Sequence, residues 1–257
     1  MKLSVIIITL NEERNIGRCL ESVKDVADEI IVADSFSEDK TEEICAKYNV
    51  TFVKQKWLGF AEQKNFANNL AHNDWILSID ADEALSEELK KSVLELKKRD
   101  FDEHNVFSLN RLTNYCGKWI HHSGWYPDTK VRIFNRKFVK WGGDAVHETL
   151  VFDGNKRVTR LRGDLEHFSY YTIEEHKKRS EKYAEIYATS AFMRGKHASK
   201  ARMIVKALWR FFHDYVLRLG FLDGKYGFII CKTQAGMTYK KYKKLIDLQN
   251  NTQCFPK

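Results

Sequence analysis

The chain has 257 residues and a formal net charge of +8, and its hydrophobic content of 43% with only 2 Pro excludes a disordered or linker-like polypeptide. No apolar run approaches the ~20 residues of a membrane-spanning helix, and we expect no secretory signal peptide because acids follow the first short apolar run. The five Cys are scattered without a CxxC pair, which favours free thiols in a reducing compartment over a disulfide framework or a zinc site.

Strands and helices alternate in the first hundred residues. Apolar runs predict buried strands at Leu3–Thr9, Glu29–Asp34, Thr51–Val53 and Trp75–Ile79. Helical spacing and capping signals predict helices near Ile16–Val23, from Ser37 or Thr41 to Tyr48, over Gly59–Leu70, and from Ser86 to about Lys98. This order predicts an α/β fold, with a mostly parallel sheet flanked by helices on both faces.

The strand at Trp75 ends in three clustered acids, Asp80, Asp82 and Glu83. Carboxylates at one edge of a sheet repel one another unless a cation lies between them. Oxygen ligands of this kind suit Mg²⁺ or Mn²⁺, which usually also hold substrate phosphates. In open α/β sheets, ligands bind beyond the carboxyl ends of the strands. The alternative is a solvated turn whose acids favour the first turn of the next helix.

The pattern changes beyond residue 100. Strands are expected at Val106–Leu109 and Lys130–Phe134, and the stretch Thr113–Tyr126 between them predicts an aromatic and polar loop. Arg132 and Arg136 could meet phosphate or form a solvated basic face. Aromatic faces stack on sugar rings, so we interpret three side chains of this loop as a carbohydrate-binding platform, unless the loop folds back onto the core: Trp119, Trp125 and Tyr126.

The C-terminal third is basic. Residues 172–257 hold 18 Lys and Arg against 7 Asp and Glu, a net charge of +11, whereas residues 1–171 carry a net charge of −3. Ser199 is expected to cap a helix through about Leu219, with a wide apolar face and a narrow polar stripe of Lys206, Arg210, Asp214 and Arg218. This pattern predicts a helix in an anionic membrane interface. The alternative is a helix packed on the rest of the chain or on a second copy.

Four motifs in this order resemble the family 2 glycosyltransferases, which have the GT-A fold. They cover about the first 85 residues: Ser4–Glu12, Ile31–Ser35 with Asp39, Gly59 with Gln63–Asn65, and Asp80–Asp82. Two later stretches, Val146–Glu148 and Gly220–Gly224, resemble the branch that adds sugars to bacterial lipopolysaccharide cores. The resemblance implies a catalytic domain at residues 1–170, with a nucleotide-sugar half at 1–100 and an acceptor half at 101–170. Residues 171–257 would form a helical, membrane-associated extension.

The resemblance also implies roles for the residues that bind the donor. Thr9, Asn11 and Glu12 would line the nucleotide pocket, and Asp34 would contact the base or ribose. From its residue type alone, Asp34 is more simply a turn residue at a helix entry. Lys64 would lie near the donor where the family usually has Arg, a change that keeps the charge but loses the two-pronged hydrogen bonding.

A metal site is implied at the acidic turn. Asp80 would approach the ribose or the metal, and Asp82 would bind the Mg²⁺ or Mn²⁺ that holds the diphosphate. His167 is a candidate further ligand, although a single His flanked by Leu and Phe is more often structural.

Sugar transfer with inversion needs one general base that takes the proton of the acceptor hydroxyl. Metal and nearby cations can stabilise the charge on the leaving diphosphate. In the stretch Trp141–Glu148, Glu148 is the best match to the family's base, and Asp144 is the rival. Spacing alone does not separate the two.

The expected function is therefore metal-dependent inverting transfer of a sugar from a nucleoside diphosphate, with a UDP-sugar favoured. The acceptor would be a lipopolysaccharide-core or other cell-envelope glycan or glycolipid. We expect a cytoplasmic enzyme, peripheral on the inner face of the cytoplasmic membrane, whose oligomeric state the sequence leaves open.

Two other classes of protein fit parts of the sequence. A nucleotidyltransferase would normally carry a Gly-rich phosphate loop where this chain has Asn11–Glu13. A nucleic-acid-binding protein could use the basic tail, but the tail's large apolar face argues against a nucleic-acid partner.

Overall fold

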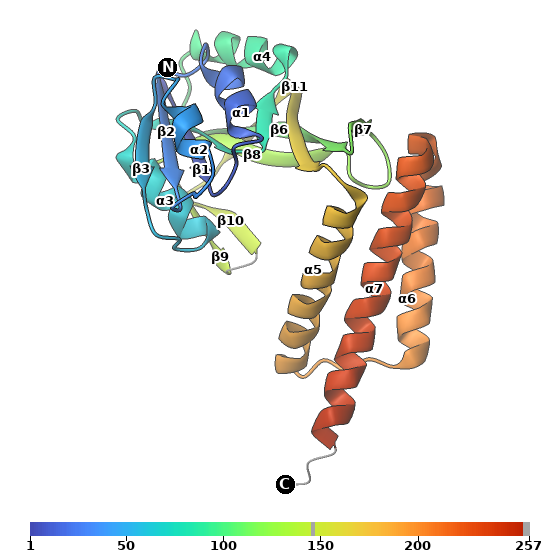
Figure 1. The fold of residues 1–257 in the computed structure, drawn as a ribbon. Coiled ribbons are helices and arrows are strands. Elements are labelled where there is room, and N and C mark those ends of the chain that lie inside the picture. The colour runs from blue at the N-terminus through green and yellow to red at the C-terminus, as the bar shows by residue number, and fades with distance from the viewer. Residues whose placement is uncertain (145–146, 254–257) are drawn as a thin grey trace. The chain divides into compact units, whose positions relative to one another are not determined.

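The computed structural model describes residues 1–144 and 147–253, without the side chains of residues 144, 147, 252 and 253. The chain groups into two compact units (Figure 1). Unit 1 comprises residues 1–112 and 128–168, and unit 2 comprises residues 113–127 and 169–257. The assignment of functions to residues 1–100, 101–170 and 171–257 stays a prediction.

Unit 1 is built on a sheet whose first part is parallel. The strands β1 (Leu3–Thr9), β2 (Glu29–Asp34), β3 (Thr51–Lys54) and β4 (Trp75–Asp80) pair in the order β3-β2-β1-β4. In this register Thr9 lies beside Asp34, and its neighbour Ile8 lies beside Asp80. The carboxyl ends of β1, β2 and β4 therefore meet at one edge, where an α/β sheet binds ligands.

The sheet continues beyond β4 with other strands. They follow in the order β8 (Asp128–Asn135), β6 (Asn105–Tyr115), β11 (Arg157–Tyr170) and β5 (Glu83–Leu85). β8 is antiparallel to β4 and to β6, and β11 is antiparallel to β5. A separate antiparallel hairpin consists of β9 (Val139–Asp144) and β10 (His147–Phe152).

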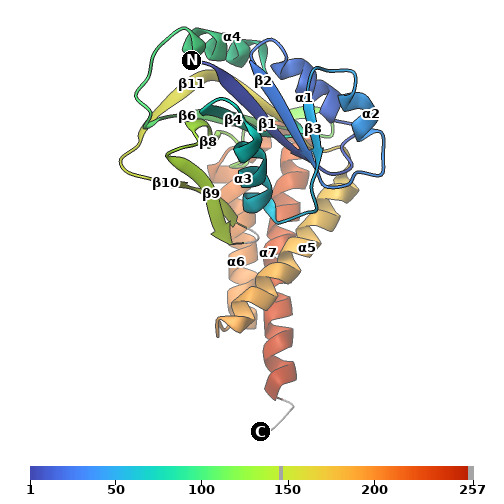
Figure 2. The ribbon, with the colours of Figure 1, turned by 90° about the vertical axis from the view of Figure 1, so that its left-hand side faces the viewer.

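Helices cover both faces of the parallel strands. Because side chains alternate along a strand, Leu3, Val5 and Ile7 face one way. There they pack with α1 (Ile16–Val23), α2 (Thr41–Cys45) and α4 (Glu87–Lys97). Ile6 and Ile8 face the other way and pack with α3 (Phe60–Leu70) and β9, which lie together in Figure 2. The predicted α/β fold, with parallel strands between helices, is confirmed.

The prediction of a helix from Ser37 or Thr41 to Tyr48 is wrong in its cap and length. α2 ends at Cys45, and its N-cap is Lys40, whose side chain makes no capping bond. The two hydroxyls instead tie the loops after β1 and β2 together. Ser37 Oγ accepts the N–H of Asn11, and Thr41 Oγ1 accepts the N–H of Glu12. The capping signals there serve the loops instead of the helix.

Unit 2 is mostly helical. Its elements are β7 (Lys118–Ile120), α5 (Ile173–Met193), α6 (Lys200–Phe212), a π-helical turn (His213–Leu217), a 3-10 turn (Gly220–Asp223) and α7 (Gly224–Gln253). Thr172 caps α5 and Ser199 caps α6 through their side-chain oxygens. α5 and α6 both pack against α7 (Figure 1). Among the described residues, no helix is both long and apolar enough to cross a bilayer.

The predicted aromatic loop is partly strand. Thr113–Tyr115 ends β6 and pairs with β7 in a hairpin. Trp125 packs with Tyr115, Tyr170 and His176 in an apolar cluster, and Tyr126 lies edge-on to His121 with ring centroids 5.6 Å apart. The role of Trp119, Trp125 and Tyr126 in binding an acceptor stays a prediction.

Asp223, from the Gly220–Gly224 stretch, fastens this loop to the helices. Its carboxylate is almost fully buried and accepts the backbone N–H groups of His121 and His122 at 3.2 and 3.0 Å. Gly227 is required here, because a Cβ at that position would lie 1.9 Å from the carbonyl oxygen of Gly220. The stretch that resembles the lipopolysaccharide branch thus has a structural role in this chain.

Buried His176 predicts a loss of stability in acid. Burial, aided by Arg179, lowers the pKa of His176 from 6.5 to about 4. Between these two pH values the His is protonated in the unfolded chain but still neutral in the folded chain, so protonation favours unfolding. The contribution of neutral His176 to the free energy of unfolding is therefore fully present above pH 6.5 and is lost as the pH falls through 4. The complete loss lowers the free energy of unfolding by about 3 kcal/mol. Urea unfolding over this range should show it, and a His176→Leu variant should have a flatter profile; an equal slope would contradict the assignment.

Candidate active site

The carboxyl end of β1 carries polar groups that face into the edge of the sheet. The hydroxyl of Thr9 is buried and has no hydrogen-bond partner among the described residues. Asn11 has a left-handed backbone (φ 55), and its side chain accepts the N–H of Glu38 at 2.8 Å. Glu12 Oε2 accepts from Asn15 Nδ2 at 2.7 Å. The predicted donor residues therefore lie on a braced loop.

Asp34 is fully buried at the end of β2. One of its carboxylate oxygens accepts the backbone N–H of Ser37 at 2.8 Å, and the other accepts the Ser37 hydroxyl at 2.5 Å. These bonds are those of a turn residue. Its contact with a base or ribose stays a prediction.

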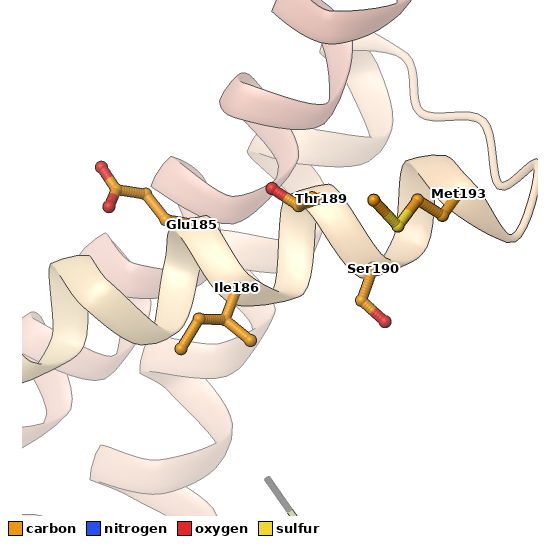
Figure 3. Close-up of a pocket in the computed structure, with 5 residues that line it drawn as sticks. All are labelled: Glu185, Ile186, Thr189, Ser190 and Met193. Atoms are coloured by element: carbon orange, nitrogen blue, oxygen red, sulfur yellow. The ribbon is translucent and has the colours of Figure 1, made fainter. Parts of the chain in front are cut away.

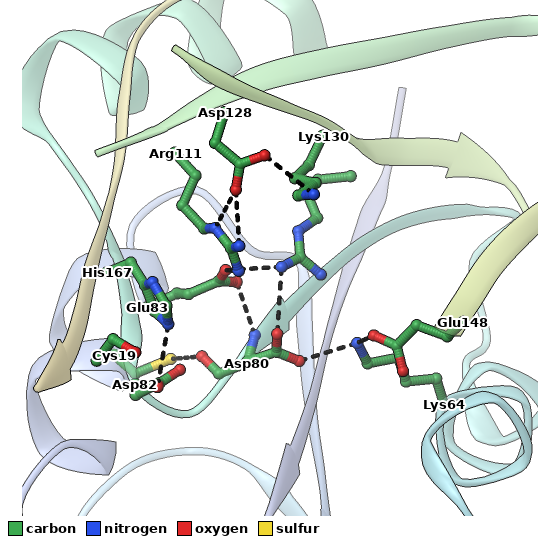
Figure 4. A network of polar contacts seen from close by, with 12 residues as sticks. Cys19, Lys64, Asp80, Asp82, Glu83, Arg111, Asp128, Lys130, Glu148 and His167 are labelled. Carbon is green, nitrogen blue, oxygen red and sulfur yellow. Dashed lines mark hydrogen bonds and ion pairs between the residues drawn. The ribbon is translucent and has the colours of Figure 1, made fainter. Parts of the chain in front are cut away.

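Glu83 anchors the acidic turn after β4. Its side chain is fully buried, and one oxygen accepts the backbone N–H of Asp80 at 2.9 Å. The other oxygen accepts from Arg132 at 2.6 Å and lies 3.4 Å from Arg111, which also binds Asp128 (Figure 4). Glu83 therefore begins β5 as a paired structural carboxylate, and it fixes the conformation that presents Asp80 and Asp82.

Asp80 lies between two buried cations. Its carboxylate oxygens lie 3.0 Å from Lys64 Nζ and 3.2 Å from Arg132 Nη2. Burial alone would raise the pKa of Asp80, but the charges of Lys64 and Arg132 outweigh it and hold this pKa well below its ordinary value of 3.8. Asp80 is thus ionised and its charge is already balanced.

The stretch Gln63–Asn65 of α3 places Lys64. Asn65 holds the backbone of Trp141, donating to its C=O at 2.8 Å and accepting its N–H at 2.9 Å, so the β9–β10 hairpin is fixed against α3. The side chain of the preceding residue, Lys64, is buried and only 1% exposed. Its Nζ lies 2.6 Å from Glu148 Oε1 and 4.5 Å from the centroid of the Trp141 ring. The structure therefore joins Asp80, Lys64 and Glu148 in one row (Figure 4).

Asp82 and His167 also meet. Asp82 Oδ2 lies 3.2 Å from His167 Nε2, and β11 brings His167 there because it pairs with Glu83 across the two strands. No three His, Cys, Asp or Glu side chains within residues 1–144 and 147–253 converge as a complete metal cluster. Of the three predicted ligands, two are adjacent, and the third, Asp80, is paired with cations.

The remaining predicted residues divide in two groups. The side chain of Asp144, the rival base, lies outside the described residues. Trp119, Trp125 and Tyr126 belong to unit 2. Sequence patterns indicated neither the bracing of the acidic turn by Arg111 nor the burial of Glu83. The alternation of charged and apolar residues in Lys130–Phe134 was the one signal that placed Arg132 on the same face as Lys130.

Sequence comparison identifies the class of enzyme. The family described as Glycosyl transferase family 2 matches residues 4–153 of the chain. The chain therefore belongs to family 2 of the glycosyltransferases, and its α/β architecture is the GT-A fold expected for that family.

Two curated relatives span almost the whole chain. An uncharacterized glycosyltransferase of Rickettsia prowazekii is 30% identical over 260 residues, covering 98% of this chain and 89% of that protein. The lipopolysaccharide core biosynthesis glycosyltransferase LpsC of Rhizobium meliloti is 30% identical over 251 residues, covering 91% of this chain and 88% of that protein. Among solved structures, S. aureus TarS 1–349 in complex with UDP is 15% identical with a TM-score of 0.45, over 98% of this chain and 92% of that chain. That structural likeness is too distant to carry a conclusion.

Proposed function

We propose that this glycosyltransferase is a metal-dependent, inverting enzyme that takes a sugar from a nucleoside diphosphate, preferably UDP. Its acceptor is a lipopolysaccharide-core or other cell-envelope glycan. The observation that carries the proposal is the row of Asp80, Lys64 and Glu148 at the carboxyl end of β4, with the Asp82–His167 pair next along the chain. The relative named as a lipopolysaccharide core enzyme supports the acceptor class.

Glu148 is the proposed general base. One of its oxygens, Oε1, is held by Lys64, whereas Oε2 is buried without a partner among the described residues. As the acceptor oxygen bonds to the anomeric carbon, Glu148 takes the hydroxyl proton. The bond from that carbon to the diphosphate breaks, and its electron pair leaves with the diphosphate. Lys64 orients the base and provides positive charge close to Asp80.

Asp82 and His167 fit a divalent cation, because a carboxylate oxygen and an imidazole nitrogen already lie 3.2 Å apart. Mg²⁺ and Mn²⁺ are commonly held by one or two protein carboxylates together with substrate phosphates, which suits a site with few protein ligands. When bound, the ion would neutralise charge on the leaving diphosphate. Asp80 would then meet the ribose, since Lys64 and Arg132 already balance its charge.

The nucleotide would lie along the ends of β1 and β2. The unpartnered hydroxyl of Thr9 is available to a ligand, and Asn11 and Glu12 are held in place by the loop that follows β2. We assign Asp34 to the base or ribose side of the same pocket.

A donor screen tests the proposal. The protein is mixed with a series of nucleoside-diphosphate sugars, with Mn²⁺ or Mg²⁺, and with lipopolysaccharide cores truncated at successive sugars. We expect nucleoside diphosphate to be released with one donor and one core, in amounts equal to the sugar transferred. Release of pyrophosphate from a nucleoside triphosphate would favour a nucleotidyltransferase instead.

Membrane docking is the second part of the proposal. The surface of α6 exposes a strip of large apolar side chains, with Val205 63% and Leu208 67% exposed, which we call the α6 strip: Ile204, Val205, Leu208, Trp209 and Phe212. The expected polar stripe is not all available to lipid, because Arg210 pairs with the buried Asp214. Exposed Lys200 and Lys206 remain as cations beside the strip. Apolar side chains flanked by cations fit an anionic membrane interface at the inner face of the cytoplasmic membrane.

Vesicles that contain anionic lipid should bind the protein, and salt should weaken the binding because it screens the attraction between charges. Replacing Lys200 and Lys206 by Glu should reduce binding to anionic vesicles only, whereas replacing Val205 and Leu208 by Ser should reduce binding to all vesicles. Co-sedimentation at two salt concentrations measures both effects.

A matched control replaces two exposed lysines of unit 1, Lys91 and Lys98, by Glu, with the same change in net charge. This variant should bind vesicles like the parent. Equal and salt-independent binding to neutral and anionic vesicles would contradict the electrostatic contribution. A dimer in sedimentation equilibrium without vesicle binding would assign the α6 strip to a second copy.

A further inference from the structure

Two hollows border the helices of unit 2, and they differ in chemistry. One, of about 400 Å³, is lined by Glu185, Ile186, Thr189, Ser190 and Met193, which all project from α5 alone (Figure 3). It contains no cationic side chain. The other, of about 470 Å³, lies between α5 and α7 and combines lysines with apolar side chains. We call the second hollow the α5–α7 groove.

The α5–α7 groove has a surplus of positive charge. Lys177, Lys232 and Lys240 line it together with the acid Glu181. Lys240 pairs with Glu181, whereas Lys177 and Lys232 have no acidic partner among the described residues. Two lysine ammonium groups that share one groove without a counter-charge favour an anion such as phosphate.

The rest of the lining is apolar. Phe228 and Met237 line the same groove, and Phe228 is 44% exposed. The ring of Phe228 also contacts Phe211 of α6 and Tyr215, with centroids 5.9 and 5.8 Å apart, so the apolar lining continues from α7 toward α6. A free phosphate would leave this apolar surface in water, whereas a lipid phosphate could cover it with its hydrocarbon part.

Gly236 keeps the groove open. It lies inside α7, where glycine weakens a helix because it gains the most backbone freedom on unfolding. No positive φ and no close neighbour require it, since a Cβ there would meet nothing within 4 Å. A larger side chain at this position would therefore be tolerated by the fold and would fill the groove.

We propose that the α5–α7 groove binds the phosphate-bearing headgroup of an anionic lipid, with Lys177 and Lys232 on the phosphate and Phe228 and Met237 on the adjoining hydrocarbon. The inference deepens the proposed membrane docking and rests on it for its biological use. It adds a defined headgroup site to unit 2, whose α6 strip attracts lipid only through general charge and apolar contact. Such a site would hold the enzyme on phosphate-rich lipids.

The test uses the full chain and soluble short-chain lipid, with no transfer reaction. Isothermal titration calorimetry with dihexanoyl phosphatidic acid below its micelle concentration should show one saturable site. A Lys177→Gln/Lys232→Gln variant should bind roughly 30-fold more weakly, because each cation near a lipid phosphate contributes about fivefold. Gly236→Leu, which keeps every charge, should abolish binding. Lys178→Gln/Lys225→Gln removes two exposed lysines of the same helices outside the groove and should bind like the parent.

The outcomes separate this site from its alternatives. Unchanged binding by Gly236→Leu, or an equal loss in the control variant, would overturn the proposal in favour of general charge attraction. Inorganic phosphate binding as tightly as the lipid would overturn the lipid assignment and leave a simple anion site. Donor hydrolysis by Gly236→Leu should equal that of the parent. A protein that binds the lipid in the groove but releases no nucleoside diphosphate from any donor would contradict the proposed catalytic function alone.

Discussion

Replacing Asp82 by Asn is expected to reduce sugar transfer to the background rate and to remove its dependence on added metal, while the fold stays intact. Glu83 fixes the turn through the N–H of Asp80, so the new amide should occupy the place of the carboxylate. What is lost is the negative oxygen that a hard cation needs. Nucleoside-diphosphate release over a series of Mn²⁺ concentrations, together with a thermal melt, measures both parts of the prediction.

Asp74 provides the control, because this half-buried acid precedes β4 at its opposite end and pairs with Lys137. Asp74→Asn should retain parental turnover and the parental metal response. His167→Ala should weaken the metal response in the same direction as Asp82→Asn, since the two side chains are adjacent. An Asp82→Asn enzyme with near-native turnover in the absence of metal would show that the metal site has been misplaced.

Glu148→Gln should lower turnover by roughly 10²–10⁴-fold, the usual contribution of a positioned general base. Glutamine keeps a carbonyl oxygen for Lys64 Nζ, so the hairpin and the row at β4 should persist. Donor affinity should change little because the base acts on the acceptor. Steady-state kinetics with the donor and the acceptor varied separately would show a fall in kcat with an almost constant donor KM.

Two companion variants make this result specific. Asp144→Asn should have a small effect; if it shows the large fall in kcat and Glu148→Gln does not, Asp144 is the base. Lys64→Met should lower kcat as well, because it releases Glu148, and it should also destabilise the protein. Breaking a fully buried ion pair costs about 3–5 kcal/mol, and the loss here should be smaller because the side chains of Asp80 and Glu148 are 30% and 26% exposed. Urea unfolding would separate that loss of stability from the loss of turnover.

The order of strands and helices in the first hundred residues follows from the sequence because the sheet is buried on both faces. Every residue of Leu3–Thr9 is buried, so the strand is apolar at every position except Ser4 and Thr9, and its β-branched residues distinguish it from a helix. Boundaries were less predictable where side chains bond outside their own element. Thr41 has the residue type of a cap, but its hydroxyl accepts a bond from Glu12, 29 positions away.

The partners of the charged side chains could not be deduced from the sequence. Lys64 and Glu148 lie 84 positions apart, and no local periodicity reports a contact over that distance. Glu83 is a clear example, because its place beside two other acids suggested a shared cation, whereas strand β5 turns it inward onto Arg132 and Arg111. The roles of Thr9, Asn11, Glu12 and Asp34 toward a nucleotide stay predictions that the donor screen and its variants can test.

The two hydrogen bonds between Asn65 and the backbone of Trp141 limit the insertions and deletions that the sequence of this enzyme can accept during evolution. Because the hairpin is pinned at Trp141 and Glu148 lies opposite Gly143, the number of residues between these points decides which face of β10 carries the carboxylate. A single insertion or deletion within Trp141–Gly143 of β9 would turn Glu148 away from Lys64, since side chains alternate along a strand. Descendants of this chain should therefore conserve the length of that segment, and substitutions in it are restricted as well, because Gly143 has a φ of 103° and a Cβ at Gly142 would lie 2.8 Å from Val151. Gains and losses of residues should accumulate instead in the turn after Phe152.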